Sequence, residues 1–181
     1  LVLRITPRQN LNVNEYWLPD EDRLVYDRFN EHRPDGPEVR RDGELASASW
    51  TQAYARAAAL LGQADPERTL LLGSANATVE DNYLLTQMAE ALGVDTPQYI
   101  PHVEEGAGDG WLITDDKTPN AQGCERLGMS AVDHDLLGAQ IANGDYDVIY
   151  VLEDDPVAAG LCTVDDLAAT DVVLHYYNTD N

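Results

Sequence analysis

The sequence has almost no lysine. Lys117 is the only lysine among 181 residues, and with ten arginines it faces 33 acidic residues, for a net charge of −22. Residues 1–41 hold seven arginines and eight acids, whereas residues 42–181 hold four basic residues and 25 acids. Such a surface repels nucleic acid and anionic lipid, so we expect no nucleic-acid partner. The excess of acid indicates either a salt-adapted organism or an acidic subunit of a large assembly.

Cysteine and long apolar runs are also scarce. Cys124 and Cys162 lie in different segments and form no CxxC pattern, which argues against a zinc or iron–sulfur site in this chain. Lone thiols of this kind are usually small core residues. No apolar run approaches the roughly 18 residues of a membrane span, so we expect no direct membrane insertion. We therefore predict no metal site in this segment.

The familiar catalytic motifs are missing as well. No serine stands in a GxSxG motif, and no HExxH occurs. The four histidines (His32, His102, His134 and His175) are scattered, and His134 lies between two aspartates, as expected on a solvated helix face. From the residues alone we predict no catalytic residue in this segment.

The first part of the chain, residues 1–48, has the pattern of an irregular extension. LVLRIT predicts a short strand, and the segment from Val39 to Leu45 predicts a small hairpin around Asp42-Gly43. The chain starts without Met inside the expected strand and ends just after another one. We therefore expect an internal or C-terminal fragment of a longer polypeptide.

From Ser49 onward, helical and strand patterns alternate. Helices are expected at 49–63, 77–94, 131–144 and 163–170, and strands at 68–74, 96–102, 146–155 and 171–178. The strands at 68–74 and 171–178 are expected to be buried. Residues 104–128 are rich in loop residues. The alternation predicts an α/β fold: a three-layer, Rossmann-like domain at 49–181 with a mostly parallel sheet, after the extension at 1–48.

Ligands of such sheets bind beyond the carboxyl ends of the strands, and three loops qualify. In the first, Gly73, Ser74, Asn76 and Thr78 precede a helix whose N-terminus could hold a phosphate. The loop has neither a GxGxxG motif nor a Walker lysine, and acids occupy the first helical turn. A plain capped connection is the alternative.

The second loop, Glu153-Asp154-Asp155-Pro156, follows the strongest strand pattern. Its three carboxylates could coordinate a hard cation or could simply be solvated, and they would repel a phosphate-bearing cofactor. The third loop, from Asp115 to Gly123, is either structural or an interaction surface. We assign Gly73, Ser74, Asn76, Thr78 and Asp155 as the candidate cofactor-binding residues.

Several stretches together resemble the molybdopterin oxidoreductase family. They are ITPRQNLNVNEYWLPDEDRLVYD, PEVRRDGELASASWTQA, ATVEDNYLLTQMAEALG, HVEEGAGDGWLITDDKTPNAQGCERLGM and YDVIYVLEDDPVAAG. Within that family the resemblance is closest to the large, G-type iron–sulfur subunit of bacterial NADH:quinone oxidoreductase, respiratory complex I.

Two departures from the family pattern bear on cofactors. VNEYWLPDEDR resembles a segment shortly after the last cluster ligands, but Pro19 stands where the family has Cys and Asp22 where it has Gly, while Asp20 and Arg23 match. The family turn Gly-x-Asn-Pro is here Glu153-Asp154-Asp155-Pro156. The bulk and charge of Glu and Asp disfavour an anionic pterin. Tyr16 and Trp17 are then expected to be packing anchors, and Arg23 an ion-pair partner.

The resemblance implies a scaffold domain without a redox centre, in a subunit whose iron–sulfur clusters lie N-terminal to Leu1. It implies peripheral-arm subunits of a respiratory complex as partners, a peripheral place on the cytoplasmic side of the bacterial inner membrane, and an oxidoreductase activity of the whole subunit. Two alternatives stay open. One is part of a molybdopterin-dependent, formate dehydrogenase-like oxidoreductase, and the other is a non-catalytic interaction module.

Overall fold

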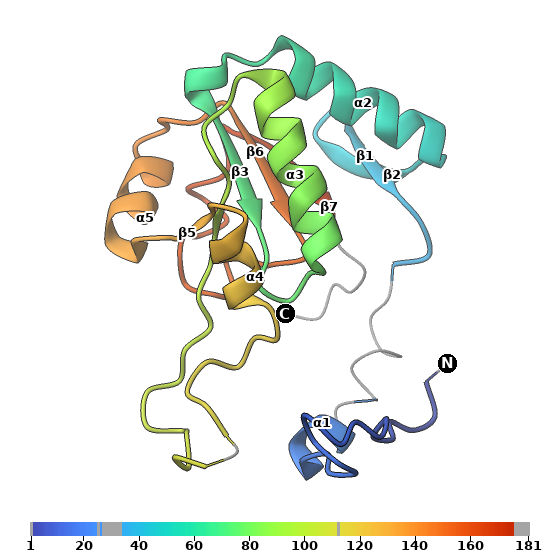
Figure 1. Ribbon diagram of the computed structural model, residues 1–181. Coiled ribbons are helices and arrows are strands. Elements are labelled where there is room, and N and C mark those ends of the chain that lie inside the picture. Colours follow the sequence, from blue (N-terminus) through green and yellow to red (C-terminus); the bar gives the residue numbers. More distant parts are fainter. Residues whose placement is uncertain (1, 25, 27–33, 112, 176–181) are drawn as a thin grey trace.

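The computed structural model describes residues 2–24, 26, 34–111 and 113–175 (Figure 1). Residues 2–9 form no strand, so the strand predicted from LVLRIT is wrong. Within residues 2–24 the pairing is a single antiparallel bridge between Asn10 and Glu15, followed by the short helix α1, Asp20–Leu24. A strand forms by pairing with another strand, and the strand pairs of the described chain do not include residues 2–6.

The side chains of this N-terminal segment correct a second expectation. Tyr16 is 65% exposed and Trp17 is 75% exposed, so neither is a packing anchor in the described structure. The ion pair expected of Arg23 is present, because its Nε lies 3.7 Å from Oδ1 of Asp20. Both of these side chains are largely exposed, so the pair contributes little to stability.

The predicted hairpin is confirmed. Strands β1 (Glu38–Arg41) and β2 (Glu44–Ser47) pair antiparallel, and Arg41 opposite Glu44 leaves a two-residue turn at Asp42-Gly43. Both turn residues have positive φ, +53° and +89°, as a type I′ turn requires. The Asp-Gly pair therefore sets the register of this hairpin.

The main sheet has five parallel strands in the order β5-β4-β3-β6-β7 (Figure 1). Their bounds are Thr69–Gly73 (β3), Gln98–Tyr99 (β4), Ser130–Ala131 (β5), Val148–Leu152 (β6) and Asp171–His175 (β7). This confirms the predicted α/β fold with a parallel sheet. The edge strand β5 was not predicted, and its second residue, Ala131, was placed in the helix expected at 131–144, because two residues carry too little pattern to be recognised.

Side chains of β3 and β6 alternate between two cores, one on each face of the sheet. On one face, Leu70, Leu72, Ile149 and Val151 pack with helix α5, His134–Ala142. On the other face, Leu71 and Leu152 pack with helix α3, Val79–Leu92, through a cluster that also contains Leu85 and Ala89. A third cluster includes Cys124 of helix α4, Ala121–Arg126. The two cores confirm the predicted layered arrangement.

Helix caps follow the sequence signals closely. Ser49 forms a capping box with Gln52 at the start of α2, Trp50–Gln63, and Thr78 accepts the backbone N–H of Asp81 at the start of α3. Gly93 ends α3 with φ of +71°, a conformation that glycine adopts without strain. Helix α2 has no fully buried residue, and the short 3-10 helix η2, Pro66–Arg68, leads from it into β3.

Two expectations near the C-terminus are wrong. Residues 163–170 form turns with backbone bonds three residues apart, such as Leu167 N to Val164 O at 3.2 Å, and not a helix. Strand β7 is an edge strand with half-buried and exposed positions, and not a buried one. Residues 176–178 of the predicted strand, and His32, lie outside the described residues.

Candidate functional site

The sheet changes its direction of winding between β3 and β6. The chain runs outward from β3 through β4 to β5, then returns to β6 on the other side of β3. This is the switch point at which open α/β sheets usually bind ligands, and the first two predicted loops meet there. Ser74 follows β3 and Asp154 lies two residues after β6, and Ser74 Oγ donates to Asp154 Oδ2 at 3.4 Å.

Asp154 is the centre of this cluster. Its side chain is 4% exposed, and it accepts the backbone N–H of Asp155 at 2.8 Å. Nε2 of His102, which follows β4, lies 3.0 and 3.1 Å from its two carboxylate oxygens. A buried carboxylate needs such partners, and a cationic imidazole supplies both a hydrogen bond and a compensating charge.

The protonation of His102 depends on this neighbour. The hydrogen bond with Asp154 raises the pKa of His102 above its ordinary value, against the opposing effect of burial. Its backbone carbonyl also accepts the N–H of Lys117 at 3.0 Å, so the histidine joins the sheet edge to the third predicted loop. The sequence analysis treated His102 as one of four scattered histidines. The signal that could have placed it is its position just after a strand of the same parallel sheet as Asp154.

Ser74 is held from the opposite side by Asn82 of α3. The Asn82 side chain accepts the Ser74 N–H at 3.1 Å and donates to the Ser74 carbonyl at 2.8 Å, and both residues are fully buried. Ser74 Oγ also accepts the N–H of Asn76 at 3.0 Å. Sequence reasoning missed Asn82, because a polar residue inside a helix usually faces solvent.

The third loop joins the same region through Asn120. Its N–H donates to the carbonyl of Ala75 at 3.0 Å, and its side chain donates to the carbonyl of Ala77 at 2.9 Å. These two bonds hold the third loop against the loop between β3 and α3. All three loops singled out in the sequence therefore meet at one end of the sheet.

The other predicted cofactor residues have structural contacts. A Cβ on Gly73 would lie 2.3 Å from Cε of Met129 and 2.6 Å from Oδ1 of Asn82, so glycine permits this close packing. Thr78 caps α3, and Asp155 accepts the N–H groups of Val157 and Ala158. The contacts of Thr78 and Asp155 each lie within the residue's own loop or helix start.

The geometry does not form a nucleophile and base. In a serine–histidine–aspartate site the histidine lies between the other two residues, but here the carboxylate of Asp154 lies between Ser74 and His102. The Ser74 hydroxyl is buried and already donates and accepts a bond. The cluster is therefore arranged to join loops, and its chemistry is that of a buried ion pair with a titratable member.

Metal ligation has little support in the described part of the chain, where no group of three or more His, Cys, Asp or Glu residues is placed to hold an ion. The carboxyl groups of Glu153, Asp154 and Asp155 do not converge on one place. Asp154 faces His102, Asp155 caps its own turn, and burial raises the pKa of Glu153.

Burial also raises the pKa of each cysteine thiol, Cys124 and Cys162, to about 11.

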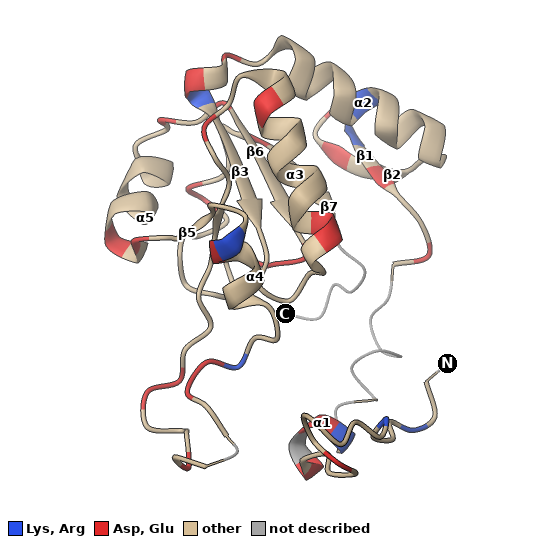
Figure 2. Ribbon diagram, viewed as in Figure 1, with Lys and Arg blue, Asp and Glu red and all other residues tan. Residues whose placement is uncertain are grey.

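The acidic surface predicted from the sequence surrounds this site. Figure 2 shows acidic residues on most helices and loops of the α/β domain, with few basic residues among them. A shallow hollow of about 350 Å³ lies beside the site, lined by Val79 of α3 and by residues of α4 that include Arg126. In the described residues, the helices are too short or too polar to cross a bilayer.

Comparison with known proteins found one matching family model and several similar proteins. Residues 1–27 match the family model described as "NADH-ubiquinone oxidoreductase NDSU1/NuoG-like, 4Fe-4S domain". The G subunit of the NADH-quinone oxidoreductase of Rickettsia conorii is 35% identical over 92 residues, which cover 51% of this chain and 14% of the relative.

Two further relatives show the same partial match. Subunit 3 of the NADH-quinone oxidoreductase of Thermus thermophilus is 33% identical over 91 residues, 50% of this chain and 12% of the relative. The mitochondrial NADH dehydrogenase [ubiquinone] iron-sulfur protein 1 of Solanum tuberosum is 30% identical over 93 residues, 51% of this chain and 13% of the relative. The resemblance to the G-type iron–sulfur subunit is confirmed, and the matched part spans only about one seventh of these relatives.

Proposed function

We propose that this chain, a partial relative of the iron–sulfur subunit of NADH:quinone oxidoreductase, provides a scaffold domain for that electron-transfer subunit. The domain at residues 49–181 holds no redox centre of its own in this proposal. The extension at residues 1–48 joins it to a part that binds the clusters. The whole subunit would then take part in electron transfer from NADH to quinone.

The single observation that supports the scaffold role is that the protein's own side chains occupy the switch point of the sheet. Ser74, Asn82 and Asp154 occupy the place where an open sheet binds its ligand, and all three are buried and hydrogen-bonded to neighbouring loops. An anionic pterin dinucleotide would have to displace these bonds and lie against the carboxylate of Asp154. The residues present do not fit that cofactor.

The iron–sulfur part of the proposal concerns residues 1–27. Clusters of this kind are held by cysteine thiolates, and this stretch contains neither cysteine nor histidine. The residues therefore do not fit a cluster of their own, although the stretch matches a 4Fe-4S domain model. We infer that it is the end of that domain, with the ligands elsewhere in the longer polypeptide.

Partners and location follow from the same relationship. Subunits of the peripheral arm of a respiratory complex would surround the acidic domain. The subunit would lie on the cytoplasmic side of the bacterial inner membrane, without entering it. The strongly acidic surface supports this in one respect, since it would be repelled by anionic lipid.

Metal and cofactor analysis of the full-length protein tests the proposal. We expect iron and acid-labile sulfide in the full-length protein, electron paramagnetic resonance signals after reduction, and neither molybdenum nor pterin. The matched control is the 181-residue chain alone, which should retain no stoichiometric iron after reconstitution with iron and sulfide.

Each alternative gives its own result. Tightly bound molybdenum and pterin would indicate a formate dehydrogenase-like oxidoreductase and overturn the scaffold role. A full-length protein without iron would indicate an interaction module without redox chemistry. Iron bound in stoichiometric amount by the 181-residue chain would contradict the assignment of the ligands to another part of the polypeptide.

A further inference from the structure

An arm, residues 103–119, leaves the domain after β4 and returns to it at α4 (Figure 1). Its two sides are joined like a hairpin. Val103 pairs with Asp116, and the Glu104 N–H donates to the Asp115 carbonyl at 2.9 Å. At its base, the Lys117 N–H donates to the carbonyl of His102. The arm therefore starts from the hydrogen-bonded sheet edge described above.

Side chains of the arm bond to backbone groups of described residues on both sides of its tip. Oδ1 of Asp109 accepts the N–H of Trp111 at 2.8 Å and that of Ile113 at 2.9 Å. Oδ1 of Asp115 accepts the Gly108 N–H at 2.6 Å, and a Cβ on Gly108 would lie 3.0 Å from the carbonyl oxygen of Ile113. These bonds add to the backbone bond from the Asp109 N–H to the Ile113 carbonyl at 3.1 Å, and one of them holds the backbone N–H of Trp111.

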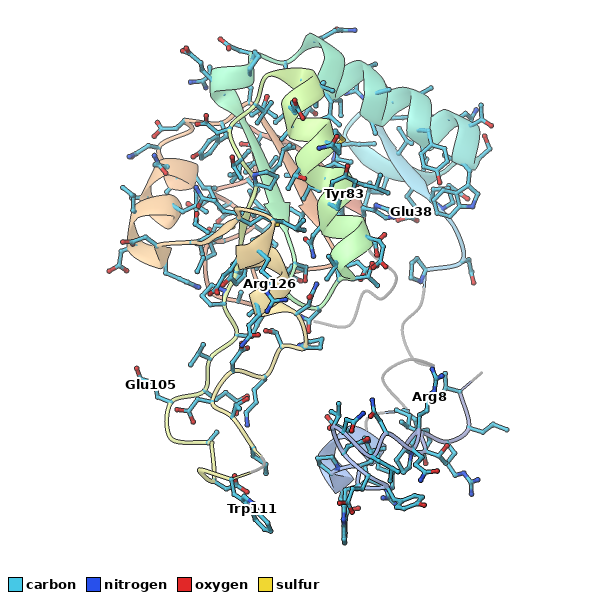
Figure 3. The ribbon with its side chains drawn as sticks, in the orientation of Figure 1. Arg8, Glu38, Tyr83, Glu105, Trp111 and Arg126 are labelled. Atoms are coloured by element: carbon cyan, nitrogen blue, oxygen red, sulfur yellow. The ribbon has the colours of Figure 1, made fainter. Side chains whose placement is uncertain are left out.

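Trp111 is 86% exposed in this position. Figure 3 shows it at the end of the arm, directed away from the domain, with Glu105 also on the arm. Residues 103–116 contain five acids and no basic residue. A large aromatic side chain is thus presented on an acidic arm whose base is paired like a hairpin.

We propose that the arm docks into a neighbouring protein subunit, with Trp111 entering an apolar pocket bordered by arginine or lysine. Buried tryptophans are prominent among the residues that dominate interface affinity, and a cation over the indole ring adds attraction. The arm's carboxylates favour a basic surface around that pocket. The inference rests on the proposed function, which supplies neighbouring subunits.

The negative charge of this chain disfavours anionic lipid, nucleic acid and a second copy of the chain as partners of the arm. The five acids around Trp111 would be repelled by anionic lipid and by nucleic acid, although tryptophan alone suits a membrane interface. A second copy of this chain is also a poor partner, because residues 42–181 hold 25 acids against four basic residues. A basic surface of another protein is the complement that remains.

Photo-crosslinking from position 111 tests the docking directly. The full-length protein carries p-benzoylphenylalanine in place of Trp111, the assembled complex is purified and irradiated, and crosslinked peptides are identified by mass spectrometry. We expect one dominant crosslink to another subunit, within a surface rich in arginine or lysine. Crosslinks to lipid, to nucleic acid or to the same chain would overturn the proposal, as would an assembled complex without any crosslink.

A matched pair of tryptophan variants measures how much the Trp111 side chain contributes to binding within the complex. Trp111→Ala should speed loss of this protein from the purified complex by about tenfold or more, the effect of removing an interface anchor. Trp50→Ala is the control, because Trp50 is 59% exposed on α2, outside the arm. Equal loss rates for wild type and Trp111→Ala, or equal acceleration by both variants, would overturn the proposal.

Failure of the docking inference is distinguishable from failure of the proposed function. A full-length protein that lacks iron, or that joins no respiratory complex, contradicts the proposed function. A full-length protein that carries iron and assembles, yet shows no contact from position 111, contradicts only the docking of the arm.

Discussion

Asp154 shows how one buried carboxylate can organise several loops. It is bonded to Ser74 after β3, to His102 after β4 and to the N–H of Asp155 in its own loop. The Gly73, Ser74, Asn76 and Thr78 candidates were predicted as a phosphate loop or as a plain capped connection. The contacts favour the second interpretation, because Ser74 is hydrogen-bonded to Asp154 and Asn82, and Thr78 caps α3.

The pair of His102 and Asp154 makes a prediction about pH. The pKa of His102 is raised in the folded chain above 6.5, so the imidazolium is stabilised by folding. Its contribution to the free energy of unfolding should be fully present below about pH 6.5 and lost as pH rises through the higher folded pKa. Urea unfolding of wild type and His102→Gln, from about pH 5.5 to 8.5, measures it as a difference that shrinks with pH.

The control for this experiment is His134→Gln, at the exposed first residue of α5. It accounts for the general effect of replacing a histidine in an acidic chain. A difference between wild type and His102→Gln that stays constant, or that grows above about pH 7, would contradict the assigned role of the pair.

The two cysteines give a second prediction at this scale. Burial raises the pKa of each thiol to about 11, so only about one thiol in a thousand is ionised at about pH 8. We expect both thiols to react slowly with a disulfide reagent in the native chain, and rapidly once urea unfolds it. Rapid modification of either cysteine in the native chain would show that its surroundings are open.

At the scale of elements, helix α5 packs very closely against the segment after β6. A Cβ on Gly138 would lie 2.6 Å from the backbone carbonyl oxygen of Leu161, which cannot rotate away as a side chain can. Gly138 therefore lets the helix approach the connection between β6 and β7. A glycine inside a helix normally weakens it, and here close packing accounts for its presence.

This gives a matched pair of glycine substitutions. Gly138→Ala should lower the free energy of unfolding by about 1–3 kcal/mol, because α5 must shift away from Leu161. Gly62→Ala in α2 has nothing within 4 Å of its new Cβ and should raise stability by about 0.5–1 kcal/mol through helix propensity. Denaturant unfolding of both variants measures the two effects. A stabilising Gly138→Ala would mean that α5 is not packed as described.

Elements with a strong local signal were predicted well. The hairpin turn at Asp42-Gly43 and the helices expected at 49–63 and 77–94 depend on signals from nearby residues, such as those at Ser49 and Gly93. The two-residue strand β5 and the turns at 163–170 were not recognised. In the second case Thr163 and Asp166 form a cap-like pair, but the chain reaches β7 before a helix can propagate.

At the scale of the whole molecule, the net charge of −22 dominates. Acids close together on one surface repel each other. At a salt concentration of about 0.1 M, this repulsion is largely screened between charges more than about 10 Å apart. We expect the midpoint of thermal unfolding to rise as NaCl increases from about 10 mM to about 1 M. Circular dichroism during heating measures this rise.

A charge-reduced variant serves as the control. Glu105→Gln, Glu90→Gln and Asp95→Asn together remove three exposed carboxylates, from the arm, from the last turn of α3 and from the segment after α3. Its midpoint should be higher than that of wild type at low salt and should depend less on NaCl. A wild-type midpoint independent of salt would favour the interpretation of the surface as an interface over that of salt adaptation.

Local patterns along the chain were enough to predict the α/β class, the hairpin, most helices and the acidic surface, because periodicity, caps and composition need no knowledge of distant residues. Local patterns could not predict that Ser74, His102 and Asp154 lie together. Nor could they predict that Asn82 and Asn120 hold the loops around them. These residues are up to 80 positions apart, and strand order brings them to one sheet edge. The exposure of Trp111 likewise had no signal in the sequence, because no periodic pattern covers the arm.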